Sequence, residues 1–498
     1  MSLTDLEAAA TVGLARSFHG GDTTAFCDLS IVASVEQRAG RMAPTLDGVP
    51  PPVASPAGGA ACSRTAARLL DDILATRDVG LVLEWAELAR EQGVTAPPSL
   101  LPSLLNIAAM HGRTRETIEP ILGERGLWLA AQREPWRAAV PSLSLSSARA
   151  RWETATRHER FMALSSLRRH DPAEARAMVE SSWASLSATD RAEAVLTLAE
   201  RLSMDDEPFL ERCLDDRAGS VQRAAVQLLA TLPASRLAAR VRARLAACLV
   251  IQPGALAKWR TGARKGTLAI NKPATCDASM RRDGVSPRFS AADASSRFGI
   301  DPDDAKAWRE DEDWWVLQMI ATAPPGAALA DPPPQPSDVI LAAMAMPDGH
   351  IALTGWRAAA VLHRDEAWAA ALLETWCLPS AEGAALESLW SVLTPAQRER
   401  FGPIILTTRG FKSQRLELAL NLLDPRCVAF SRACLESLVT VKRGFVDFER
   451  VARGVHRATA VDAIATIERI QAAGGHYTSH VASRVLPLRA RLAEVFPS

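Results

Sequence analysis

The sequence predicts an all-α fold, an α-solenoid in which helix pairs stack along the chain, and three observations support this prediction. Apolar residues recur at helical spacing in most segments. Alanine and leucine dominate the 498 residues whereas tyrosine occurs once, a composition that favours helix over sheet. Hydrophobic residues make up 48% of the chain, which excludes general disorder and suffices for a large buried core.

The clearest helical element lies within residues 214–233. Apolar residues recur there three and four positions apart along one face, at Val221, Ala224, Ala225, Leu228, Leu229 and Leu232. Pro233 ends this helix, because a proline cannot continue the backbone hydrogen bonding. Small side chains at 224 and 225 allow a neighbouring helix to approach closely. The segment is therefore typical of the second helix of a HEAT-like repeat.

Acidic residues cluster around the predicted helix starts of this region: Asp205, Asp206, Glu207, Asp215 and Asp216. Carboxylates at such positions accept hydrogen bonds from free backbone N–H groups and pair with nearby arginines, here Arg191 or Arg217. We interpret these acids as structural rather than as a metal or acid–base site. Arg217 and Arg223 are expected to belong to the same ladder of charges between repeats.

The domain organisation is predicted from proline-rich breaks and from the spacing of the helices. First helices begin about 30 residues apart after residue 150, close to the period of HEAT-like units. Proline runs at 50–52 and 332–334 interrupt the helical pattern. We predict an N-terminal helix with a Pro/Gly-rich linker over 1–60, a first helical-repeat array over 61–251, an irregular middle segment over 252–337 and a second array over 338–498.

Five short motifs together carry a family resemblance. They are Gly-Glu-Arg-Gly-x-Trp-Leu-Ala at 123–130 with Trp136, Asp-Pro-x-x-Ala-Arg at 171–176, Asp-Glu-Pro-Phe-Leu-Glu at 206–211, Leu-Asp-Asp-Arg at 214–217 and Arg-Asp-Gly at 282–284. Over roughly residues 60–330 the chain resembles an uncharacterised bacterial HEAT-like helical-repeat family. Its members are encoded beside MoxR-type AAA ATPases, von Willebrand A-domain proteins and SWIM zinc-finger proteins. The resemblance implies an accessory or scaffold role, with an AAA ATPase or von Willebrand A-domain protein as partner, and no established chemistry.

The most basic stretch runs from 236 to 288. It holds twelve Lys and Arg residues against two Asp residues, in a chain whose formal net charge is zero. Such a cluster can contact phosphates, and Trp259 could stack on a base. It could equally bind an acidic protein partner or pair with the acidic run that follows it. The candidate surface consists of Arg242, Arg244, Lys258, Trp259, Arg260, Arg264, Lys265, Arg281 and Arg282.

The chain contains 13 tryptophans, and most fall on apolar helix faces where large rings fill the space between stacked helices. Three of them, Trp308, Trp314 and Trp315, lie beside acids in the irregular middle segment. A similar element occurs at 124–129, where Arg125 and Trp128 hold the matching places. These five residues are the candidates for a protein-binding hot spot.

Signatures of enzyme chemistry are missing from the sequence. The segment 261–267 lacks the Gly-Lys-Ser/Thr spacing of a phosphate loop, and no dinucleotide or hydrolase motif occurs. His476 and His480 are four residues apart without the Glu that a zinc protease requires, so neither a metal nor a cofactor is predicted. An enzyme would need a cleft in which polar residues converge, for example Arg125, Arg217 and Asp283.

The sequence therefore favours a non-enzymatic scaffold or adaptor that binds a protein partner through an α-solenoid surface. The alternative is a nucleic-acid-binding helical-repeat protein that uses the basic 236–288 segment. Eight cysteines are scattered without a Cys-x-x-Cys pair and are expected to be reduced thiols. Neither a signal peptide nor a membrane-spanning run is evident, so a cytoplasmic location is expected.

Overall fold

The computed structural model describes most of the chain: residues 27–28, 31–32, 59–140, 152, 156–251, 268–300, 308, 311–329, 335–377, 383–407, 412–440, 448–472 and 480–497. The chain divides into two compact units, residues 1–54 and 55–498. In the first unit only 27–28 and 31–32 are described, and they are helical. The predicted N-terminal segment over 1–60 therefore lies almost entirely outside the described residues.

The second unit is built almost wholly from α-helices. They are α4 (Arg64–Thr76), α5 (Val79–Glu91), α6 (Leu101–Met110), α7 (Arg115–Ala131), α8 (Glu134–Ala139), α11 (Arg157–His170), α12 (Pro172–Ser182), α13 (Ala188–Thr197), α14 (Glu207–Cys213), α15 (Gly219–Ala230), α16 (Arg236–Cys248), α18 (Ala278–Arg282), α19 (Ala291–Phe298), α20 (Asp311–Thr322), α21 (Pro336–Met344), α22 (Gly349–Leu362), α23 (Glu366–Leu372), α25 (Gly383–Trp390), α26 (Pro395–Ile405), α27 (Lys412–Asn421), α28 (Val428–Thr440), α29 (Phe448–Gly454), α30 (Ala460–Ala472) and α31 (His480–Val495). The prediction of an all-α fold is confirmed.

Short elements join these helices. The strands β1 (Ala60–Ala61) and β2 (Val94–Thr95) pair in parallel, and β3 (Leu249–Ile251) pairs antiparallel with β4 (Leu268–Ile270). Single turns of 3₁₀-helix occur at η1 (Pro98–Leu100), η2 (Gly112–Thr114), η4 (Trp183–Ser185), η5 (Met204–Asp206) and η8 (Arg457–Thr459), and η7 (Leu373–Cys377) is a π-helix.

Local sequence signals set many of the helix starts. Asp171 caps α12 by accepting a hydrogen bond from the backbone N–H of Glu174 at 2.9 Å, and Pro172 occupies the first helical position. Thr156 and Glu159 form a capping box at the start of α11. The acids at 205–207 lie in η5 and the first turn of α14, as their pattern predicts.

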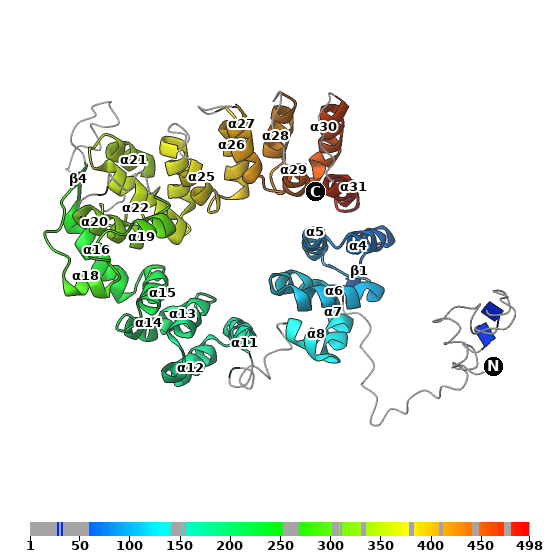
Figure 1. The fold of residues 1–498 in the computed structure, drawn as a ribbon, viewed down its shortest axis with the longest axis horizontal. Helices are drawn as coiled ribbons and strands as arrows, with labels where there is room; N and C mark the ends of the chain where they lie inside the picture. The colour runs from blue at the N-terminus through cyan, green and yellow to red at the C-terminus, as the bar shows by residue number, and fades with distance from the viewer. Residues whose placement is uncertain are drawn as a thin grey trace, which may run out of the picture. The chain divides into compact units, whose positions relative to one another are not determined.

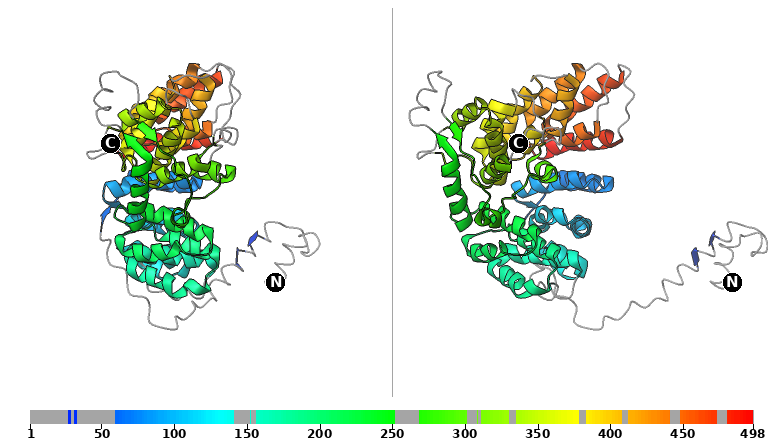
Figure 2. Two further views of the ribbon diagram at one scale, coloured as in Figure 1. Left: turned by 90° about the vertical axis from the view of Figure 1, so that its left-hand side faces the viewer. Right: turned by 60° about the vertical axis from the view of Figure 1, so that its left-hand side comes forward.

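Helices pack on the next helix in the chain and on the one after it. Thus α13 contacts α15, α14 contacts α15, and the same order holds for α26, α27, α28 and α29 (Figures 1 and 2). One hydrophobic core cluster runs through the described array, with Trp85, Trp314 and Trp356 among its fully buried side chains. This order of contacts agrees with the solenoid prediction, because each helix pair covers the apolar face of its neighbours.

The segment predicted to be irregular carries three described helices, α18, α19 and α20. Helix α20 packs against α16 on one side and α22 on the other. Gly355 makes the α20–α22 contact close, because a Cβ at this position would lie 2.6 Å from Ile320. The described helices α19 and α20 of this segment are therefore part of the packed array.

The first and last helices of the array also pack together. Helix α31 contacts α4 and α5 (Figure 1). The Trp85 and Phe496 rings meet edge to face with centroids 5.9 Å apart. The Arg489 guanidinium donates to the Glu84 carboxylate at 2.8 Å, and Arg491 donates to Asp72 at 2.6 Å. We call this contact the seam. Through it the array of residues 55–498 closes on itself.

Asp424, between α27 and α28, gives the array a defined acid sensitivity. Burial alone would raise the pKa of this carboxyl, but hydrogen bonds from Arg426 and Arg398 outweigh burial and lower the pKa to about 2. Because the folded-state pKa lies below the unfolded value, Asp424 stabilises the fold above about pH 4, and this contribution is lost as pH falls towards 2. We expect Asp424→Asn to lower the free energy of unfolding by at most about 2 kcal/mol at pH 6.

Urea unfolding of the wild-type protein and of Asp424→Asn at several pH values measures this contribution. The difference between wild type and Asp424→Asn should shrink between pH 4 and pH 2. A difference that stayed constant over this interval would contradict the assignment.

None of the helices in the described ranges is both long and apolar enough to cross a membrane.

Candidate binding groove

The acids predicted to be structural are held by arginines. Asp206 and Arg168 are both completely buried, and Arg168 Nη1 donates to Asp206 Oδ1 at 3.0 Å. Arg176 reaches the same carboxylate at 2.8 Å. Asp216 accepts two hydrogen bonds from Arg191, at 2.9 and 3.0 Å. These pairs join α11, α12 and α13 to the turns around α14, as the ladder interpretation expects.

A second charge cluster contains much of the described part of the basic segment. Asp283, of which 3% is exposed, accepts from Arg240 and forms an ion pair with Arg244 at 2.8 Å. Arg282 binds Asp215 at 2.7 Å and Glu211 at 3.2 Å. In this cluster the arginines are balanced by Glu211 on α14, by Asp215 in the turn after α14 and by Asp283 directly after α18.

The remaining patch residues divide into two groups. Arg242 and Arg281 are exposed and donate to the backbone carbonyls of Pro233 and Cys276. The other five lie outside the described residues: Lys258, Trp259, Arg260, Arg264 and Lys265. Nucleic-acid binding through this segment stays a prediction.

The exposed ion pair of Asp215 predicts a small stability effect. Its side chain is 62% exposed, and the hydrogen bond from Arg282 lowers the pKa of the carboxyl. We expect Asp215→Asn to lower the free energy of unfolding by less than about 1 kcal/mol and to leave partner binding intact, because solvent screens such a pair. Thermal unfolding and a binding assay of the folded variant check both parts. Loss of binding in a folded variant would give Asp215 a direct role.

The tryptophans proposed as a hot spot are core residues. Trp314 is fully buried between the Phe289 and Phe298 rings, each with its centroid 5.3 Å away. Trp308 packs edge-on against His350, and Trp315 donates from Nε1 to the Pro287 carbonyl at 2.9 Å. This corrects the expectation of an exposed surface, since the neighbouring acids belong to the first turn of α20 and do not mark a solvated loop.

The matching element on α7 is more accessible. Arg125 is exposed and Trp128 is half-buried, with the carbonyl of Trp128 accepting from Gln132 at 3.0 Å. Helix α7 is separate in the array from α18, beside which Asp283 is already occupied by arginines. The cleft that an enzyme hypothesis would need from Arg125, Arg217 and Asp283 is therefore not seen among the described contacts.

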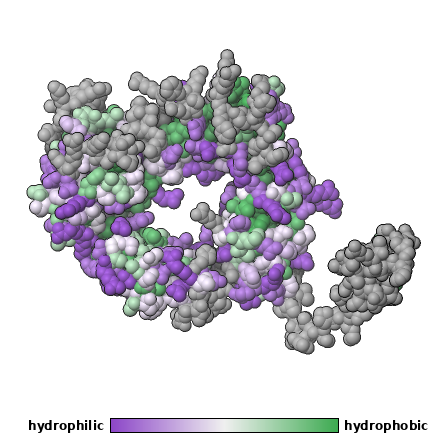
Figure 3. All heavy atoms as spheres, viewed as in Figure 1, coloured by the Kyte–Doolittle hydropathy of each residue, from purple (hydrophilic) through white to green (hydrophobic). Residues whose placement is uncertain are grey.

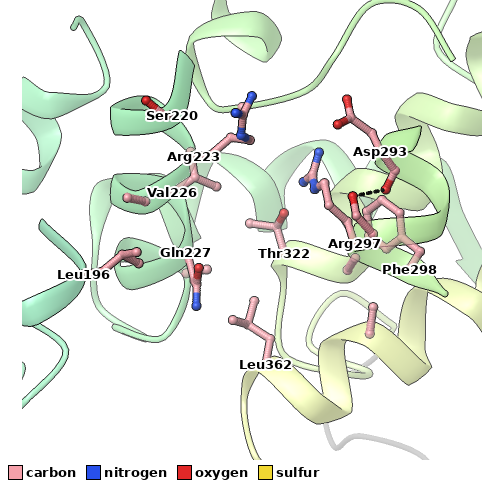
Figure 4. A pocket seen from close by; sticks show the side chains of 16 residues that line it. Leu196, Ser220, Arg223, Val226, Gln227, Asp293, Arg297, Phe298, Thr322 and Leu362 are labelled. Atoms are coloured by element: carbon pink, nitrogen blue, oxygen red, sulfur yellow. Dashed lines mark hydrogen bonds between the residues drawn. The ribbon is translucent and has the colours of Figure 1, made fainter. Parts of the chain in front are cut away.

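A groove lies elsewhere, between α13 and α15 on one side and α19, α20 and α22 on the other (Figure 4). It consists of a cavity of about 530 Å³ and an adjoining one of about 940 Å³, which share six lining residues. The shared residues are Gln227, Ser296, Arg297, Phe298, Ala358 and Leu362. We call the two cavities together the groove.

The polar side chains of the groove include two pairs that each lie one helical turn apart, one pair on α15 and one on α19. On α15, Arg223 and Gln227 are four residues apart and exposed, beside the buried stripe that begins at Val221. On α19, Asp293 and Arg297 are likewise four residues apart, and the Ser290 side chain caps this helix. Figure 4 shows Arg223 and Arg297 projecting from facing elements into the same opening.

The groove is positively charged. Its described lining includes Arg223, Arg297, Arg357 and Arg364, whereas Asp293 is the one acid among these residues. Burial lowers the pKa of Arg297; the Asp293 charge opposes this and the Arg223 charge adds to it. Arg297 is nevertheless exposed to solvent, and its guanidinium keeps its positive charge at neutral pH.

Two of these arginines have internal contacts. Arg297 donates to the Gln318 side chain at 3.3 Å, and its guanidinium lies 5.0 Å from the centre of the Phe298 ring. Arg357 is buried and donates to the Phe298 carbonyl. The lining thus offers hydrogen-bond donors and positive charge beside apolar walls, which suits binding of an anionic group.

The histidine beside the groove has a structural partner, and the described residues offer no metal site. His363 lies next to the carbonyl of Thr322, with Nε2 3.1 Å from the oxygen, and burial lowers its pKa. His480 begins α31, and His476 lies outside the described residues. Within the described ranges, no group of three or more His, Cys, Asp or Glu side chains is placed to hold a metal ion.

Sequence reasoning missed most of the groove. Arg223 was assigned to the ladder, and Arg297, Arg357 and Arg364 were not singled out. The one available signal was the pair Asp293 and Arg297 at helical spacing. It fell within a segment that was predicted to be irregular.

Comparison with known proteins gives one match. A family model described as "Family of unknown function (DUF5691)" matches residues 2–496. No curated protein and no solved structure matches the chain at a significant level.

Proposed function

Since the chain belongs to the DUF5691 family, a family of unknown function, we propose its function from its own geometry. It is a non-enzymatic scaffold or adaptor that binds a protein partner along the groove. The observation that carries this proposal is the groove itself: two joined cavities of about 530 and 940 Å³, walled by five helices from distant parts of the array.

The character of the lining supports a protein ligand. Apolar side chains such as Leu196, Leu232 and Leu362 alternate with donors such as Gln227 and Arg297. Peptide segments bind helical repeats in this way, because the repeats present a long surface built from successive helices. By resemblance, the proposed partner is a MoxR-type AAA ATPase or a von Willebrand A-domain protein. The proposed location is the cytoplasm, where free thiols such as Cys213 and Cys434 persist.

A site-specific photo-cross-linking experiment tests the proposal. A photoreactive amino acid is introduced at Gln227, which is exposed and borders both cavities, and in a matched control at Gln132, which is exposed on the turn after α7. After irradiation in the source cell, we expect a reproducible protein adduct at 227 that is not formed at 132. Failure to form a protein adduct at 227, or formation of the same adducts at both positions, would overturn the proposal.

A further inference from the structure

We propose that the groove recognises an acidic peptide segment of the partner, and that Arg223 and Arg297 bind its carboxylates from facing walls. This inference rests on the proposed function, since it names the chemistry of the segment that the groove would hold.

The pairing of arginines elsewhere in the array provides the first argument. Arg168, Arg191 and Arg398 are all satisfied by carboxylates within the fold. By contrast, Arg223 and Arg297 make no ion pair with any described residue, although Asp293 lies on the same face as Arg297. Cations left together in a partly buried groove repel each other, and an anion placed between them relieves this repulsion.

The second argument concerns geometry. Arg223 projects from α15 and Arg297 from α19, and both point into one opening (Figure 4). Arg297 is oriented by the Gln318 side chain at 3.3 Å and by the Phe298 ring. A guanidinium oriented in this way loses less entropy when it forms two parallel hydrogen bonds to a carboxylate. Arg364, at the far end of the groove, adds a further positive charge to the same path.

The size and lining of the groove favour a peptide over a small anion. A single phosphate or carboxylate ion would leave most of the two cavities empty. Apolar and cationic side chains are mixed in the lining, whose apolar members include Leu196, Val361 and Leu362. Acidic residues interspersed with apolar ones would match this mixed lining. The face shown in Figure 3 also mixes hydrophilic and hydrophobic residues and does not present one apolar patch.

The lining argues against a single-stranded nucleic acid as the ligand. Base stacking needs exposed aromatic rings. Phe298 is the one aromatic residue among the described lining residues, and its ring is buried against Trp314 with centroids 5.3 Å apart. The groove therefore supplies charge without a stacking platform.

The experiment extends the cross-linking design. The adduct at Gln227 is digested and the trapped segment is sequenced. Binding of this segment is then measured with chains that carry Arg223→Gln or Arg297→Gln. Arg242→Gln is the matched control, because Arg242 is exposed on α16 outside the groove and belongs to the predicted basic patch. Thermal unfolding confirms that each variant is folded.

We expect the trapped segment to carry an excess of Asp and Glu. A synthetic peptide of that sequence should bind about tenfold more tightly than its Asn/Gln analogue at low salt. Each groove variant should lose about tenfold in peptide affinity and Arg242→Gln should lose none. Affinity should fall with added salt, because the arginines remain partly accessible to solvent.

Four results separate the two proposals. An acidic trapped segment whose affinity depends on Arg223 and Arg297 supports the inference. A trapped segment without excess acid, or affinity that neither groove variant changes, overturns the inference while the proposed function stands. A nucleic acid trapped at position 227 in place of a protein segment overturns both the proposed function and the inference. Absence of any adduct at 227 overturns the proposed function and the inference with it.

Discussion

Replacing Arg168 with methionine is expected to lower the free energy of unfolding by about 3–5 kcal/mol. The Arg168 side chain is completely buried, and its counter-ion Asp206 is equally buried. Methionine fills a similar volume but leaves this carboxylate with Arg176 and the backbone N–H of Ser203 as its partners. Removing one member of a buried ion pair costs far more than removing an exposed one, because the remaining charge is poorly solvated.

The cost extends beyond the ion pair. Arg168 donates to the backbone carbonyls of Pro172, Leu198 and Glu200, at 2.7, 3.2 and 2.8 Å. The Leu198 and Glu200 oxygens lie after the end of α13. Without the guanidinium they lose this donor, and an acceptor that is left buried without a donor costs about 1–3 kcal/mol.

Hydrogen exchange and urea unfolding together test this prediction. In Arg168→Met the amides of residues 198–206 should exchange faster, because local unfolding there becomes easier. The control is Arg157→Met: Arg157 is 54% exposed, donates to Asp190 at 2.6 Å and should contribute far less to stability, because solvent screens this pair. Equal effects of the two substitutions would show that the ladder is not a stabilising network.

The sequence is most informative where one helix or one cap decides the structure. The stripe from Val221 to Leu229 faces the core in α15, and Asp171 caps the start of α12. The ladder was also predictable, since acids at helix starts and arginines one repeat away reflect local geometry. These features depend on residues whose spacing along the chain fixes their spacing in the helix.

The groove depends on contacts that no local pattern encodes. Arg223 and Arg297 lie on different helices, and they line one opening because α15 contacts α20, α20 packs against α22 and α22 contacts α19. The acids beside Trp314 suggested a solvated surface. They form the first turn of α20, and Asp313 is bound by Lys272 at 2.6 Å while the indole beside it enters the core. The acidic residues next to Trp314 in the sequence therefore do not indicate the environment of its ring.

The seam is the contact with the greatest separation in sequence, and Arg489→Met is expected to open it. Arg489 is almost fully buried and donates to Glu84 at 2.8 Å and to the carbonyls of Ala452 and Val455 at 2.8 and 2.9 Å. It therefore ties α5 to both α29 and α31. Its loss removes a charge-assisted pair and two backbone contacts, for which we expect about 3 kcal/mol of local stability.

Hydrogen exchange distinguishes opening of the seam from general destabilisation. In Arg489→Met, amides of α4, α5 and α31 should exchange faster while those of α20 and α22 stay protected, because α20 and α22 pack with each other far from the seam. Arg491→Met is the matched control. The ion pair that Arg491 forms with Asp72 is about half exposed on both sides and should matter by less than about 1 kcal/mol.

A double-mutant cycle with Glu84→Gln isolates the ion pair from the backbone contacts. If the pair closes the array, the two substitutions should be coupled by at least about 1 kcal/mol, since each removes the same interaction. Additive effects would mean that closure rests on the packing of Trp85 against Phe496 and not on the charges.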